Sequence, residues 1–158
     1  MTTQVCRRQK QDGRDRMTDA SAGFAALADK QYLNLETFRR NGNGVRTPVW
    51  FAAAPADDPA AAPTLYVYTT ADSGKAKRIR LNGTVRIAPC DARGGVKGPW
   101  IDARAEIVGP AEFDRGMRLI DRKYRPWKQI LDWFTQVSGQ IRRHQRIVLA
   151  IRSAAPVT

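Results

Sequence analysis

The chain has 158 residues, with 27 Lys and Arg against 15 Asp and Glu, and a net charge of +12 at pH 7. A hydrophobic content of 42% in a chain of this length can fill one core, so we expect a single domain whose ligand is an anion. Two cysteines, Cys6 and Cys90, form neither a disulfide framework nor a four-ligand zinc site, and no apolar run approaches the roughly 20 residues of a membrane span. We therefore expect a soluble, cytoplasmic protein without a bound metal.

The N-terminal segment is expected to be a disordered basic tail, residues 1–20, followed by one folded domain, residues 21–158. Residues 1–16 hold five basic and two acidic residues and almost no apolar side chain. From Ser21 to Ala28 the apolar residues Phe24 and Leu27 recur at helical spacing behind a serine that can cap a helix. The domain is thus predicted to begin with a short helix.

The next segment has the pattern of a β-hairpin. Residues 32–39 alternate between apolar and polar side chains, and the following Asn-Gly-Asn-Gly at 41–44 is a strong turn signal. Residues 45–54 are then the return strand. Pro48 cannot donate a hydrogen bond to a neighbouring strand, which places it at a sheet edge, at a bulge or beside a bound ligand.

The rest of the chain is predicted to hold a loop, four more strands and three helices. The loop is residues 52–63, the strands are 65–70, 84–90, 98–108 and 146–152, and two amphipathic helices follow Pro110 and Pro126. Six short strands with hairpin signals predict a small, mostly antiparallel barrel with helices at its rim, whose closure would remove the exposed strand edges.

A basic segment within this pattern is the candidate anion site. Ser73 can cap a helix whose first residues are Gly74 and Lys75, and free N–H groups at such an end bind phosphate. Lys75 and Arg78 share one face of this helix, whereas Asp72 would repel an anion unless it points away. Residues 73–97 hold seven basic residues against Asp91 alone: Lys75, Lys77, Arg78, Arg80, Arg86, Arg93 and Lys97.

Other interpretations remain open. The basic side chains can simply be a solvated surface, or the barrel can bind single-stranded nucleic acid, which we rank lower because the strand carrying Tyr66 and Tyr68 is apolar on both faces. A hydrolase has no support, because His144 is the only histidine and no nucleophile motif accompanies it. Cys90 is expected to be a small buried side chain.

Four segments, taken together in order, resemble a known family. They are YLNLETFRRNGNGVRTPVWF, LYVYTTADSGKAKRIRLNGTVRIAPC, DARGGVKGPWIDARAEIV and DRKY. These resemble the pyridoxamine 5'-phosphate oxidase-like split β-barrel flavoproteins, and within them the enzymes that depend on the deazaflavin coenzyme F420. The resemblance runs from about Lys30 to Tyr124. It departs at Asn82-Gly83, where many relatives have Asn-Pro, and in the long loop at 53–63.

The resemblance implies a homodimeric split β-barrel of about six antiparallel strands with flanking helices, and a cofactor-binding domain over residues 21–158. It implies that the cofactor phosphate is held by the segment T-T-x-x-S-G-K-x-K-R, and that T-P-V-W runs beside the cofactor ring. The implied cofactor-binding residues, with Gly74 added by the helix-terminus reasoning, are Thr47, Pro48, Val49, Trp50, Thr69, Thr70, Ser73, Gly74, Lys75, Lys77 and Arg78. No catalytic acid is identified.

The implied activity is hydride transfer from reduced coenzyme F420 to a small organic substrate, with FMN-dependent oxidoreductase chemistry as the alternative. The anionic tail of F420, a phosphodiester followed by carboxylates, calls for more basic groups than the single phosphate of FMN. The seven basic residues of 73–97 therefore favour F420. A nucleic-acid-binding barrel is the alternative from another class of protein.

Overall fold

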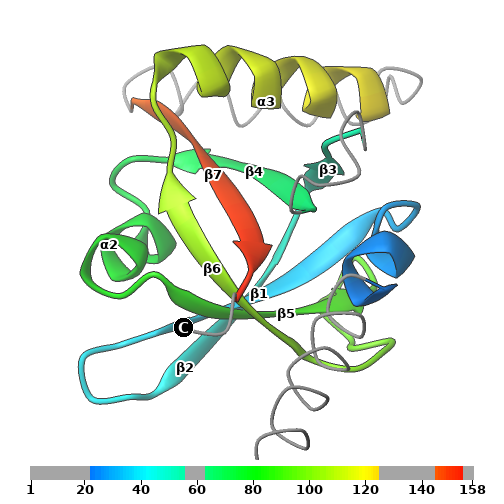
Figure 1. Ribbon diagram of the computed structural model, residues 1–158. Coiled ribbons are helices and arrows are strands. Elements are labelled where there is room, and N and C mark those ends of the chain that lie inside the picture. Colours follow the sequence, from blue (N-terminus) through cyan, green and yellow to red (C-terminus); the bar gives the residue numbers. More distant parts are fainter. Residues whose placement is uncertain (1–21, 56–62, 125–144, 155–158) are drawn as a thin grey trace, which may run out of the picture.

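The computed structural model describes residues 22–55, 63–124 and 145–154. One antiparallel sheet contains all the strands of these ranges, which confirms the mostly β fold class (Figure 1). Its strands are β1 (Tyr32–Phe38), β2 (Gly44–Val49), β3 (Phe51–Ala53), β4 (Thr64–Thr70), β5 (Thr84–Cys90), β6 (Ile101–Ile107) and β7 (Arg146–Ser153). The helices are a short one at residues 22–27, α2 (Gly74–Leu81) and α3 (Pro110–Tyr124). None of the helices in these ranges is both long and apolar enough to cross a membrane.

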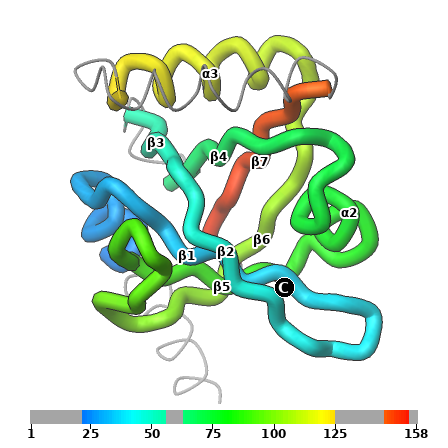
Figure 2. The backbone as a smooth tube through the Cα atoms, turned by 180° about the vertical axis from the view of Figure 1, so that it is seen from behind, coloured from blue at the N-terminus to red at the C-terminus, as the bar shows by residue number. Residues whose placement is uncertain are grey.

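The sheet curls into a split barrel whose two edges are formed by neighbouring parts of the chain. The strand order is β2-β1-β5-β6-β7-β4-β3 (Figure 2). Val49 still pairs with Leu33 of β1, whereas Phe51 already pairs with Val67 of β4. The prediction of one return strand over 45–54 is therefore wrong: the chain changes partners at Trp50, which makes seven strands instead of six. The expected closure by strand pairing is also absent among the described strands, because β2 and β3 end the sheet.

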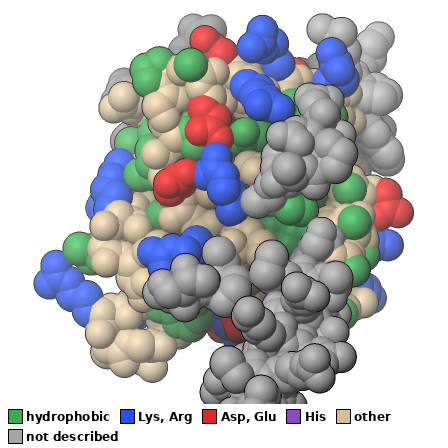
Figure 3. All heavy atoms as spheres, in the orientation of Figure 1, with side chains coloured by type: hydrophobic (Ala, Val, Ile, Leu, Met, Phe, Trp, Pro, Cys, Tyr) green, Lys and Arg blue, Asp and Glu red, His purple; other side chains and the backbone are tan. Residues whose placement is uncertain are grey.

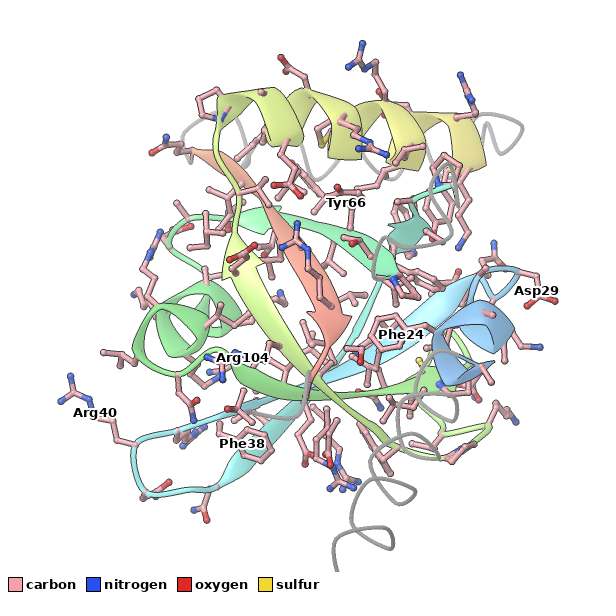
Figure 4. The ribbon with its side chains drawn as sticks, viewed as in Figure 1. Phe24, Asp29, Phe38, Arg40, Tyr66 and Arg104 are labelled. Carbon is pink, nitrogen blue, oxygen red and sulfur yellow. The ribbon has the colours of Figure 1, made fainter. Side chains whose placement is uncertain are left out.

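The interior of the barrel is the main core. It is built from alternate residues of the strands, because successive side chains of a strand point to opposite faces. Fully buried members include Leu33, Leu35, Val67, Ile87 and Leu149. The helix at residues 22–27 and helix α2 lie on opposite sides of the curled sheet (Figures 1 and 2). The first of them buries Phe24, which Figure 4 shows next to the strands, together with Leu27.

Helix α3 covers a second, smaller core on the other face of the sheet. Tyr66 points from β4 toward this helix (Figure 4) and packs with Ile120, Tyr124 and Val148. Gly116 permits the close approach, because a Cβ atom at this position would lie 2.8 Å from Cγ1 of Val148. The predicted helix after Pro110 is thus confirmed. The tail at 1–20, the second predicted helix after Pro126, Cys6 and His144 lie outside the described residues.

Candidate anion site at the start of helix α2

The predicted basic helix forms, and its first turn is capped as expected. The Ser73 hydroxyl accepts a hydrogen bond of 3.2 Å from the Ala76 N–H. Ala76 and Ile79 are buried against the barrel, which leaves the face with Lys75 and Arg78 for other contacts. Because the N–H groups of a first helical turn have no partner within the helix, the start of α2 carries a partial positive charge.

Lys75 turns back from α2 toward the end of strand β4. Its Nζ lies 3.4 Å from Oγ1 of Thr69, and the Thr69 hydroxyl donates to Oγ of Ser73 at 3.1 Å. The lysine is partly buried and Thr69 is buried. Burial lowers the pKa of the Lys75 ammonium below its usual value, and the nearby Arg78 lowers it further. The structure therefore brings together three of the predicted phosphate-binding side chains.

Arg78 belongs to the last turn of α2, but its guanidinium reaches back to the start of the helix at Gly74. Its Nε donates a 2.7 Å hydrogen bond to Oγ1 of Thr37 in β1, and a Cβ atom at Gly74 would lie 2.9 Å from its NH1. The missing side chain of Gly74 thus leaves room for the guanidinium. Burial and then the charge of Arg39 lower the pKa of Arg78.

Thr37 is a member of the site that the sequence analysis missed. It is buried and follows Leu33 and Leu35 at every second position of β1, so its side chain lies on the face of the barrel core. A polar residue at a position where the alternation calls for an apolar one was the available signal.

The two cations of this site lack a negative partner within the described part of the chain. The charges that act on Lys75 and Arg78 are those of Arg78 and Arg39, respectively. Neither cation belongs to any ion pair between described residues. Two partly desolvated cations at the positive end of a helix repel one another, and a bound anion would relieve that repulsion.

Arg86 and Lys97 do not join this site, so the seven basic residues of 73–97 do not form one cluster. Arg86 lies 3.5 Å from carboxylate oxygens of both Glu36 and Asp102, and Lys97 lies 3.8 Å from Asp91. Arg86 pairs in register with Glu36, so its side chain lies on the face of the sheet opposite to that of Thr37. Acidic and basic side chains are also interleaved on the face of the molecule seen in Figure 3.

Two further basic residues belong to α2 itself. Lys77 is exposed and lies roughly 200° around the helix from Lys75, so the structure does not bring it to Thr69; its role stays a prediction. Arg80 also points away from Lys75 but folds back, and its NH1 donates to the carbonyl of Ala71 at 2.8 Å. Arg80 therefore stabilises the loop before the helix.

The residues of the predicted ring-binding segment, Thr47–Trp50, differ in their exposure to solvent. Thr47 is partly buried and Val49 is buried. Pro48 is exposed on the edge strand β2, close to the turn at Gly94. Trp50 lies beyond β2 and stacks on Tyr124 with 5.3 Å between ring centroids. Their contact with a ring stays a prediction, as does a role for Thr70, which is partly buried and accepts the Ser73 N–H through its carbonyl at 3.1 Å.

Cys90 is confirmed as a buried side chain. Burial, and then the charge of Asp91, raise the pKa of its thiol to about 11. Because the thiolate is the nucleophilic form, this cysteine is unreactive at neutral pH.

Known structures share this fold. No model of a known protein family matches the sequence, and no curated protein is significantly similar to it. A candidate pyridoxamine 5'-phosphate oxidase from Listeria innocua matches at 15% identity and a TM-score of 0.52, over 84% of this chain and 90% of its own. An FAD-binding protein from Mesorhizobium loti matches at 16% identity and a TM-score of 0.52, over 84% and 88%. The heme storage protein HutZ from Vibrio cholerae matches at 13% identity and a TM-score of 0.52, over 91% and 92%. These likenesses show the split β-barrel fold.

Proposed function

We propose that the chain is an oxidoreductase that binds reduced coenzyme F420, with the cofactor phosphate at the start of α2. The observation that carries this proposal is the pair Lys75 and Arg78, two partly buried cations without a carboxylate partner among the described residues, beside a serine-capped helix start. The glycine at position 74 supports it, because the missing side chain leaves room for the Arg78 guanidinium beside the first turn of the helix, where it adds to the positive charge. The fold that the chain shares with an FAD-binding protein also supports the binding of a flavin-like cofactor.

The arrangement of the cations favours F420 over FMN. Lys75 is next to Arg78, and Arg78 is next to Arg39 at the β1–β2 hairpin, so positive charge extends from the helix start to that hairpin. Lys75 and Arg78 are enough to bind one phosphate. The F420 tail carries carboxylates beyond its phosphodiester, and Arg39 lies where such groups would find a partner. FMN is the alternative, since Lys75 and Arg78 alone suffice for its phosphate.

The work of the protein in this reaction is to bind and orient. When bound, the reduced cofactor supplies the hydride that the small organic substrate accepts. Lys75, Arg78 and the first turn of α2 would hold the phosphate, with the Ser73 hydroxyl as a further donor and Thr69, which donates its one proton to Ser73, as its support. The segment Thr47–Trp50 would lie beside the ring. Fixing the cofactor in this way keeps its reactive carbon in register with the substrate.

A parallel titration tests the cofactor. Purified protein is titrated with F420, FMN and heme, followed by fluorescence quenching and absorbance, and with a single-stranded oligonucleotide at several salt concentrations. We expect saturable binding of F420, weaker binding of FMN and only salt-sensitive, non-specific binding of the oligonucleotide. Tight FMN with no response to F420 would overturn the cofactor assignment. Sub-micromolar oligonucleotide binding at physiological salt, with no cofactor bound, would overturn the enzyme proposal.

We also propose that the protein is a homodimer, with the partner subunit completing the cofactor pocket. The resemblance of the sequence supports this arrangement. Trp100 offers little apolar area for such an interface, because the guanidinium groups of Arg46 and Arg86 lie 4.7 and 5.4 Å from its ring centroid. Light scattering should give twice the 17.7 kDa of one chain. The mass of a monomer at working concentrations would refute the dimer.

A further inference from the structure

The corner at Trp50–Phe51, where the chain leaves one sheet edge and joins the other, is held by the last residue of α3. The Phe51 N–H donates to the Tyr124 hydroxyl at 3.1 Å. The same hydroxyl lies 3.0 Å from the Phe51 carbonyl and 2.9 Å from the Gln31 carbonyl, the two acceptors for its one proton. Phe51 thus finds on Tyr124 the donor and acceptor that a neighbouring strand would otherwise provide.

Aromatic rings also contribute contacts that stabilise this corner. Trp50 stacks on Tyr124 with an angle of 29° between the ring planes. Nζ of Lys123 lies 3.6 Å from the centroid of the Phe51 ring and donates to the Lys30 carbonyl at 2.5 Å. The end of α3 therefore contacts both residues of the corner and also residues 30–31, which precede β1.

A second tyrosine offers a matched comparison. Tyr66 belongs to the same apolar layer under α3, and its hydroxyl donates to Oε1 of Glu112 at 3.0 Å, in the first turn of the helix. Like Tyr124 it is buried, with 2% of its surface exposed against 7%. Each tyrosine joins α3 to the sheet through one hydroxyl, but of the two only the Tyr124 hydroxyl is hydrogen-bonded to the corner.

We infer that Tyr124 is a positioning residue for the cofactor ring, because it fixes the corner from which the segment Thr47–Trp50 extends. This inference rests on the proposed function. Trp50 is the one residue between two strand ladders, so contacts from outside the sheet must set its backbone path. A binding surface that is misplaced by a fraction of an ångström weakens every contact to a rigid ring.

The test compares Tyr124→Phe with Tyr66→Phe. Both variants keep the ring and lose one hydroxyl between α3 and the sheet, so both should lower the free energy of unfolding. Only Tyr124→Phe should weaken F420 or FMN binding, by about five- to twentyfold, measured at a temperature where both variants are folded. In the cofactor-free protein, hydrogen exchange of the Phe51 amide, followed by NMR, should accelerate in Tyr124→Phe and not in Tyr66→Phe.

Each outcome decides a different point. An unchanged exchange rate at Phe51 would show that Tyr124 does not hold the corner. Faster exchange with unchanged cofactor affinity, or equal affinity losses in the two variants, would overturn the positioning role. A wild-type protein that binds neither F420 nor FMN would overturn the proposed function and with it the positioning role, and the exchange rate would still show whether Tyr124 holds the corner.

Discussion

Replacing Lys75 by alanine should separate ligand binding from stability. In the free protein the ammonium is partly buried, and among the described residues its side-chain partner is Thr69 at 3.4 Å and its charged neighbour is another cation. Its removal therefore takes away little stabilisation and some repulsion. We expect the urea midpoint of Lys75→Ala to be equal to that of the wild type or higher.

The loss of cofactor affinity should be large, because Lys75 is held in place before the ligand arrives. A charge-assisted hydrogen bond from a pre-positioned, partly desolvated group is worth about 2 to 3 kcal/mol, which is roughly a 30- to 150-fold change in the dissociation constant. Burial also lowers the pKa of Lys75. As the pH rises, cofactor affinity should consequently begin to fall at a lower pH than it would if Lys75 had the pKa of an ordinary lysine.

The assay is a fluorescence titration of cofactor into wild type and three variants. Arg118→Ala removes the same charge from an exposed position on α3 and should bind like the wild type. Lys77→Ala tests the structure against the family resemblance, which places both lysines on the phosphate. The structure predicts a smaller loss of cofactor affinity for Lys77→Ala than for Lys75→Ala. Wild-type affinity in Lys75→Ala, or a larger loss in Lys77→Ala, would show that the phosphate lies elsewhere.

Three further predictions concern the scaffold. In Gly116→Ala the new methyl group would push α3 off Val148 at a cost of about 1–3 kcal/mol, against alanine's helix advantage of about 1 kcal/mol, so the free energy of unfolding should fall by up to about 2 kcal/mol. Increased stability in urea would contradict this. In a Cys6→Ser variant, which leaves Cys90 as the one thiol, Cys90 should not react with a thiol reagent at pH 8 until the protein unfolds, since its pKa is about 11. Rapid labelling of the folded protein would contradict this. Burial lowers the pKa of Lys123 to about 8, so between pH 8 and 9 this lysine binds more protons in the unfolded chain than in the folded protein, and the free energy of unfolding should rise with pH. In urea unfolding this rise should be flatter in Lys123→Met than in the wild type. The same rise in both proteins would disprove the prediction.

The sequence predicted most elements of the fold because each carries a local signal. The cap at Ser73, the turn at 41–44 and the apolar-polar alternation over 32–39 act within a few residues, and the structure confirms the cap, the turn and the strand β1, although the polar face of β1 is buried as well. The break at Trp50 has no such signal. Residues 45–54 read as one strand, and only the competition between β1 and β4 for pairing divides them.

The candidate site was predictable in part for the same reason. Lys75 and Arg78 follow from a helix start and its periodicity, which are local. Thr37 is 41 residues from Arg78 in sequence, and their contact exists only because α2 packs against β1. Charge counting also failed for Arg86, whose carboxylate neighbours come from other strands. Which cations are neutralised is decided by strand order, which composition does not contain.

The two ends of the sheet also bear on how the protein avoids association through its strands. An unpaired strand edge invites the strand of another molecule, and a curled sheet that is not closed has two of them. On β2 the edge contains Pro48, which has no N–H to donate, and the exposed Arg46, whose charge would be costly to bury. β3 is only three residues long, and the backbone groups of Phe51 are already bonded to the Tyr124 hydroxyl. Each edge is thus a poor template for an added strand, and the open barrel gains protection against aggregation from its own side chains.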